Sequence, residues 1–133
     1  MIQCNVQELE SDGVTLSHAI NGSCAALLDS GLSMKSSMAA VTIAIKSERI
    51  AGSGGKTKQT LISNPTSEDF DDASGVITLV FESTSDKIIG IHTDKPFCPG
   101  MTTAQLKECL IKGRKEAKTI FKLYRDTCSE LFR

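Results

Sequence analysis

The stretch from Val6 to Gly31 constrains the fold most, because it combines the end of a strand pattern, a turn and an amphipathic helix. Apolar Ile2, Cys4 and Val6 alternate with polar neighbours, which predicts a strand with one buried face. Ser11-Asp12-Gly13 then supplies residues typical of a turn. The chain is therefore expected to begin with a strand that turns directly into a helix.

The predicted helix begins after a cap at Thr15 or Ser17 and runs to about Asp29. Gly31 follows, where the end of a helix favours a residue that tolerates positive φ. Six residues with helical spacing form the predicted buried face: Ala19, Ile20, Ser23, Cys24, Leu27 and Leu28.

Length and composition favour one globular domain. The chain has 133 residues, of which 40% are hydrophobic and 23% charged, as in ordinary globular proteins. It has neither an apolar run of about 18 residues nor the basic and apolar start of a signal peptide. We therefore expect an intracellular protein whose cysteines are reduced structural thiols. Those cysteines, which have no C-x-x-C spacing, are Cys4, Cys24, Cys98, Cys109 and Cys128.

The remaining pattern predicts further strands and a long terminal helix. The predicted strands are Met38 to Lys46, Gln59 to Ser63, Val76 to Glu82 and Lys87 to His92, the last two joined as a hairpin. The helix begins near a Thr102 or Thr103 cap, and Gly113 predicts a bend or a close backbone approach within it. The G-S-G-G-K-T run resembles a phosphate-binding loop but lacks its first glycine, so we expect a hairpin tip there.

Six segments in order resemble the ribonuclease PH family, which includes the ring subunits of the RNA exosome. They are D-G-V-T-L at Asp12 to Leu16, A-L-L-D-S-G at Ala26 to Gly31, the strand Ala39 to Ile45, N-P-T-S-E-D at Asn64 to Asp69, the strand Val76 to Phe81, and I-F-K-L-Y-R at Ile120 to Arg125. The last of these is similar to the ribosomal RNA-processing protein 46 branch of the family.

This resemblance implies an α+β, RNase PH-like fold of the ribosomal protein S5 domain 2-like type, with a mixed sheet and helices packed on one face. Every matched segment belongs to the second half of the family fold, so residues 1–133 are expected to form that half, with the first half apparently absent. A half-fold would leave an unpaired sheet edge, and such edges favour association.

The resemblance also implies a degenerate catalytic site. Leu16 stands where the active relatives have a phosphate-binding arginine, and Asn64 stands where they have a catalytic aspartate. The hydroxyls of Thr15 and Ser17 remain, but they carry no positive charge. We therefore expect no catalytic residues and no phosphorolysis.

An acidic cluster leaves two interpretations open. Glu68, Asp69, Asp71 and Asp72 are hard oxygen ligands of the kind that suits Mg²⁺, or they form a solvated acidic turn without metal. No convergent lysine or histidine is evident near them, so we favour the turn. His18 and His92 have no partner at zinc-ligand spacing. The sequence predicts no cofactor.

Three functions compete at this point. The resemblance favours a non-catalytic exosome subunit in RNA 3'-5' processing and degradation, including rRNA maturation, in the nucleus, nucleolus and cytoplasm. Its expected partners are other RNase PH-like ring subunits and RNA threaded through the ring, with no membrane, and a homo-oligomer in isolation. The alternatives are a Mg²⁺-dependent nuclease and an autonomous RNA-binding module. Residues 102–133 hold eight Lys/Arg against four Asp/Glu, which would suit RNA binding. The net charge of −1 for the whole chain argues against an autonomous RNA-binding module.

Overall fold

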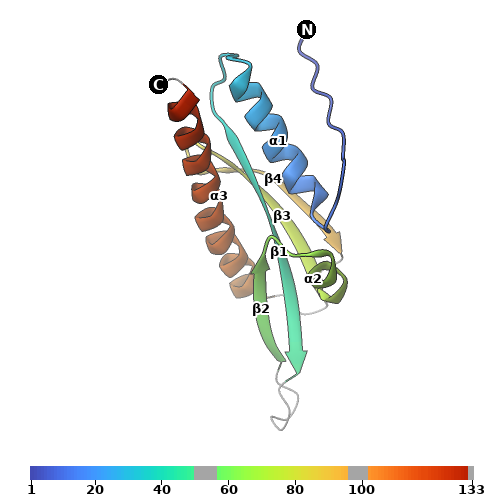
Figure 1. Ribbon diagram of the computed structural model, residues 1–133. Coiled ribbons are helices and arrows are strands. Elements are labelled where there is room, and N and C mark those ends of the chain that lie inside the picture. Colours follow the sequence, from blue (N-terminus) through green and yellow to red (C-terminus); the bar gives the residue numbers. More distant parts are fainter. Residues whose placement is uncertain (50–56, 96–101, 132–133) are drawn as a thin grey trace.

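The chain forms three helices and four strands in the residues that the computed structural model describes, which are 1–49, 57–95 and 102–131 (Figure 1). In chain order the elements are α1 (Thr15–Asp29), β1 (Met38–Arg49), β2 (Thr57–Ser63), α2 (Ser67–Asp72), β3 (Gly75–Glu82), β4 (Ile88–Lys95) and α3 (Thr103–Leu131). The G-S-G-G-K-T run and Cys98 lie outside the described residues.

The four strands form one sheet in the order β2-β1-β3-β4, and every neighbouring pair is antiparallel. Ile43 of β1 lies opposite Ser63 of β2 and Ile77 of β3, so β1 is paired on both sides over part of its length. The predicted α+β class is confirmed, but the expected mixed sheet is wrong. β2 and β3 do run in the same direction, yet β1 lies between them, so no two parallel strands are neighbours.

The main core lies between the sheet and α3. Alternate residues of β1 and β3, among them Val41 and Leu79, point toward α3 and are fully buried. Gly113 lets the helix approach closely, because a Cβ there would lie 2.8 Å from Leu79 Cδ1. The helix continues through this glycine. The sequence predicted either a bend or a close backbone approach at Gly113. The close approach is correct, but the helix packs there against side chains and not against another backbone.

The helices are not all on one face, which corrects the expectation from the sequence. Phe70 of α2 packs against Ala44 and Val76, whose side chains point away from α3. α1 instead lies along β1 where β2 no longer pairs with it. There Asn21 Nδ2 donates to Ala40 O at 2.9 Å, and Asn21 Oδ1 accepts from Ala40 N at 2.7 Å. Asn21 thus satisfies backbone groups that a neighbouring strand would otherwise bind.

The N-terminal residues do not form the predicted strand. Ile2, Val6 and Leu9 are exposed, and residues 1–10 run as an irregular arm beside α1 (Figure 1). A strand needs a partner to bind its backbone groups, and no described strand of this chain lies beside the arm.

The predicted caps gave mixed results. α1 begins after Val14, which makes no side-chain cap, while the Thr15 hydroxyl contacts Ser11 Oγ at 2.8 Å. The expected cap at Thr15 or Ser17 is therefore wrong. Thr102 does cap α3, since Gln105 N donates to Thr102 Oγ1 at 3.4 Å. None of the helices within the described residues is sufficiently long and apolar to span a membrane.

Candidate functional site

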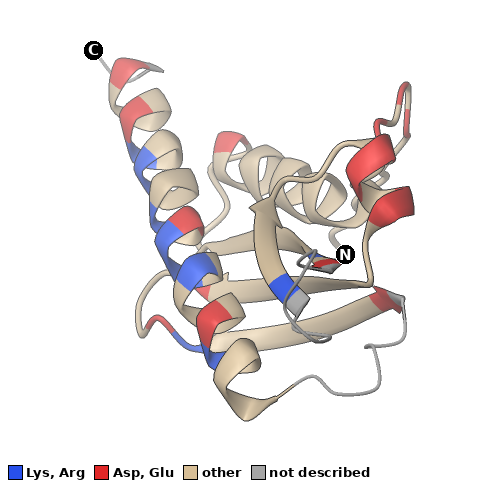
Figure 2. Cartoon of the chain, turned by 90° about the horizontal axis from the view of Figure 1, so that it is seen from below, with Lys and Arg blue, Asp and Glu red and all other residues tan. Residues whose placement is uncertain are grey.

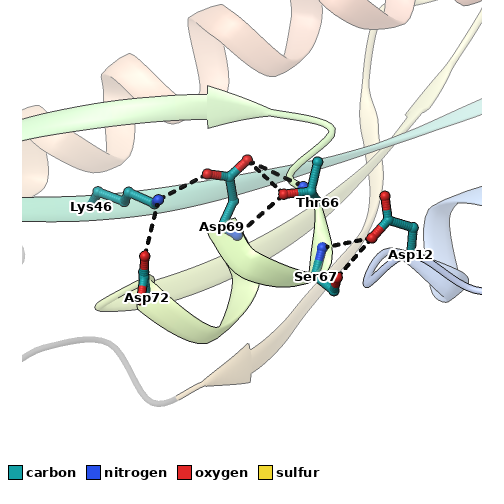
Figure 3. Close-up of polar contacts among 6 residues, drawn as sticks. All are labelled: Asp12, Lys46, Thr66, Ser67, Asp69 and Asp72. Atoms are coloured by element: carbon teal, nitrogen blue, oxygen red, sulfur yellow. Dashed lines mark hydrogen bonds and ion pairs between the residues drawn. The ribbon is translucent and has the colours of Figure 1, made fainter.

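The turn before α1 docks on the N-terminus of α2, which brings together the two segments that the sequence singled out (Figure 3). Asp12 Oδ1 accepts hydrogen bonds from Ser67 N at 3.1 Å and from Ser67 Oγ at 2.7 Å. Both bonds stabilise the carboxylate, and they lower the pKa of Asp12 from its ordinary value of 3.8. Residues 55 positions apart in the sequence thus meet at this turn.

Gly13 is required where the two segments touch. Its φ is +94°, and a Cβ at this position would lie 2.8 Å from Ser67 N, which is a backbone atom. Any other residue would therefore combine backbone strain with a clash that no side-chain rotation can relieve.

A capping box starts α2. Thr66 Oγ1 accepts from Asp69 N at 3.3 Å, and Asp69 Oδ2 accepts from Thr66 N at 3.3 Å. The two residues satisfy each other's backbone donors, which fixes the short helix at the edge of the site.

Lys46 neutralises part of the acidic cluster. Its Nζ lies 2.8 Å from Asp69 Oδ1 and 3.6 Å from Asp72 Oδ2 (Figure 3). The contact with Asp69 raises the pKa of Lys46, and the same contact with help from Thr66 lowers the pKa of Asp69. The expectation that no lysine converges on the cluster is therefore wrong. Lys46 was missed because it belongs to β1, far from the acids in sequence.

The acidic residues do not converge on one point. Glu68, Asp71 and Asp72 are exposed, whereas Asp69 is directed at Lys46 and Thr66. Across the described part of the chain, no three His, Cys, Asp or Glu side chains lie close enough together to hold a metal ion. The geometry is that of a solvated helical turn in which Asp69 and Asp72 are ion-paired with Lys46.

A cavity of about 210 Å³ lies next to the Gly13 turn. Gly13, Val14, Thr15, Leu16, Thr42, Phe70, Thr78 and Asp94 line it. In its floor the hydroxyls of Thr42 and Thr78 are buried and lie 2.8 Å apart, so they are partners of each other. Among the described residues of the lining, the one that carries a charge is Asp94, an acid that the sequence did not single out. The pairing of β3 with β4 brings it there.

The four predicted site residues occupy different environments. Leu16 and Thr15 line the 210 Å³ cavity, whereas Ser17 is buried and does not. Asn64 follows β2 with a φ of +51° and its N donates to Thr42 O, but its side chain is exposed and outside the cavity lining. Of the two degenerate positions, Leu16 lines this cavity and Asn64 does not.

One of the two histidines contacts this site, through Asp94. His18 is exposed on α1. His92 Nε2 lies 3.1 Å from Asp94 Oδ1 on exposed β4. Neither histidine lines the 210 Å³ cavity.

Comparison with known proteins identifies the fold. No family model matches the sequence. The structure is similar to the crystal structure of rice (Oryza sativa) Rrp46, with a TM-score of 0.70 and 22% sequence identity over 90% of this chain. The match covers 50% of the rice chain, so this chain spans half the length of that protein. The predicted RNase PH-like fold is therefore confirmed.

Proposed function

We propose that this chain is a non-catalytic structural subunit of an RNA exosome ring, and that it acts in RNA 3'-5' processing and degradation, including rRNA maturation. Residues 1–133 would supply the second half of an RNase PH-like domain. The expected partners are other RNase PH-like ring subunits and RNA passing through the assembled ring, in the nucleus, nucleolus and cytoplasm. The structural likeness to rice Rrp46 supports the assignment.

The cavity beside the Gly13 turn is the observation that carries the non-catalytic part of this proposal. Leu16 lines it where the resemblance implies a phosphate-binding arginine, and Asp94 adds a negative charge to the same lining. An attacking phosphate needs donors and positive charge around it. A cavity with a leucine and a carboxylate would repel the phosphate.

An activity assay tests this part directly. The protein is incubated with oligo(A), phosphate and Mg²⁺, and nucleoside diphosphates are measured against a mock purification and the double variant Leu16→Arg/Asn64→Asp. We expect no diphosphate from the unmodified protein, because loss of one such electrostatic donor typically costs about 10² to 10³ in rate. Diphosphate release above the mock level would overturn the non-catalytic assignment.

The edge strand β4 supports the proposed assembly. It ends the sheet order, so one side of its backbone pairs with no strand in the described part of the chain. Ile89 and Ile91 on this strand are 56% and 59% exposed. Unpaired edges with apolar side chains favour pairing with another chain. We therefore place the interface with a neighbouring ring subunit at β4.

A pull-down from the source cells tests the assembly. The tagged chain is expected to recover RNase PH-like exosome subunits, and Ile89→Lys/Ile91→Lys is expected to lose them, because two charges on the edge oppose pairing. Leu123→Lys is the matched control, since Leu123 is equally exposed but lies on α3. A stable monomer at micromolar concentration that recovers no ring subunit would refute the proposal.

A further inference from the structure

Six cations lie along one side of α3. Lys and Arg positions recur along this helix (Figure 2). The exposed ones are Lys107, Arg114, Lys115, Lys118, Lys122 and Arg125. At about 100° per residue these positions fall within roughly one third of the helix circumference, and we call them the basic stripe. From Lys107 to Arg125 the stripe is about 27 Å long at about 1.5 Å per residue.

The acids of α3 lie on a different side of the helix. Counted from Lys107, the positions of Glu108, Glu116, Asp126 and Glu130 fall at about 100° to 180°, outside the arc of the basic stripe. Within the described part of the chain, one stripe residue forms an ion pair: Lys118 Nζ lies 3.4 Å from Asp86 Oδ2 of the β3–β4 turn. The stripe is therefore a row of positive charge with acids along one flank, the nearest about 20° beyond Lys115.

A cavity of about 560 Å³ opens beside the C-terminal half of this stripe. Lys118 and Arg125 belong both to the stripe and to the cavity lining. The remaining lining residues are Leu28, Ser37, Ser83, Asp86, Phe121, Tyr124 and Cys128. The volume lies within the range of ligand pockets, about 300 to 1,000 Å³. The cavity thus combines aromatic and aliphatic walls with two cations and one acid, Asp86, which is paired with Lys118.

Tyr124 is held in a neutral, fixed state at the wall of this cavity. Its hydroxyl donates to Asn21 O of α1 at 3.2 Å, and its ring packs edge-on against Phe121 with the ring centroids 6.4 Å apart. Burial raises the pKa of Tyr124 to about 12, so its hydroxyl carries no negative charge at neutral pH. The Phe121–Tyr124 pair is thus an uncharged aromatic wall that does not repel an anion.

We propose that this face binds single-stranded nucleic acid, with successive phosphates along the basic stripe and one base inserted in the 560 Å³ cavity. Proteins that bind single strands combine a cationic track with aromatic side chains that contact bases. A duplex keeps its bases stacked inside and could use only the cations. An acidic peptide could pair with the stripe, but it would fill the cavity only if an aromatic side chain stood at the right distance from its carboxylates, whereas every nucleotide carries a base beside its phosphate. The site is on α3 and does not depend on the proposed ring assembly.

The first experiment measures binding of a labelled single-stranded oligonucleotide of about ten nucleotides to the full chain as a function of salt. Removing two phosphate contacts with Lys122→Gln/Arg125→Gln should weaken binding and reduce the slope of log K against log salt by about 1.4, at about 0.7 per contact. Lys35→Gln/Lys58→Gln removes the same charge from exposed positions outside α3, and its slope should stay that of the unmodified chain. Equal slopes for the two double variants would overturn the proposal.

The second experiment uses two cysteines as reporters within one molecule. Cys128 lines the cavity and Cys4 lies in the exposed N-terminal arm. We expect the oligonucleotide to slow alkylation of Cys128 but not of Cys4, and an abasic strand with the same phosphates to give no protection. Protection of Cys128 by the abasic strand would contradict a base in the cavity. The same conclusion would follow if duplex RNA or polyglutamate competed with the labelled oligonucleotide as strongly as an unlabelled single strand does. Because neither readout involves ring subunits, failure here leaves the exosome proposal standing.

Discussion

Two glycines are constrained very differently in this chain. Gly13 has a φ of +94°, and its missing Cβ would meet the backbone of Ser67, whereas Gly22 on α1 has nothing within 4 Å of that position. Gly13→Ala should lower the free energy of unfolding by about 2 kcal/mol or more, from strain and clash together. Gly22→Ala should raise it by about 0.5 to 1 kcal/mol, because alanine favours a helix interior.

Equilibrium unfolding in urea measures both changes. The pair is internally controlled, since the substitution is chemically identical and only the surroundings differ. If Gly13→Ala were as stable as the unmodified protein, the docking of the Asp12-Gly13 turn on Ser67 would be contradicted.

The ion pair of Asp69 predicts how stability depends on acid. Contacts with Lys46 and Thr66 lower the pKa of Asp69 below 3.8. Folding therefore gains stability from this carboxylate above about pH 4, and loses it as pH falls through the lowered pKa. At neutral pH the Asp69→Asn variant should be less stable than the unmodified protein. On acidification to about pH 2 it should lose less stability than the unmodified protein does. Asp29→Asn, at the exposed end of α1, is the control, and identical acid profiles for the two variants would count against the ion pair.

At the scale of elements, α3 depends on how closely it approaches the sheet. Gly113→Ala would gain about 1 kcal/mol of helix propensity, but its Cβ would lie 2.8 Å from Leu79 Cδ1 in a fully buried position. Overpacking of a core typically costs about 1 to 3 kcal/mol, so we expect net destabilisation. Leu79→Ala removes the nearest contact and leaves Phe81 Cε2 at 3.3 Å, so in that background the same change should be much less destabilising.

A double-mutant cycle over Gly113 and Leu79 measures this coupling by chemical unfolding. Additive effects would mean that the helix does not press on Leu79. The cycle thus distinguishes close packing from a simple helix-propensity effect.

For the whole molecule, the structure predicts that the N-terminal arm contributes nothing to folding of the single chain. Residues 1–10 are exposed and form no strand, so deletion of residues 2–9 should change the free energy of unfolding by no more than about 0.5 kcal/mol. Far-ultraviolet circular dichroism should show unchanged helix and strand content. A loss of several kcal/mol would show that the arm packs on this chain after all.

Local patterns by themselves determined most elements of this protein. Helical spacing located α1 and α3, and alternation of apolar residues located the strands, because these periods depend on neighbours within a few positions. The Thr102 cap and the positive φ at Gly31 were also readable from the sequence. The loss of the phosphate-binding arginine at Leu16 was inferred from the family resemblance, and it remains a prediction.

Only the tertiary structure decided which distant residues meet. The alternation at Ile2 and Val6 signals a strand, but a strand forms only beside a partner, and the arm finds none. Lys46 reaches Asp69 and Asp94 reaches the cavity of Leu16 through strand register and turn docking. No local pattern encodes these contacts, because they depend on the order and direction in which the strands pair.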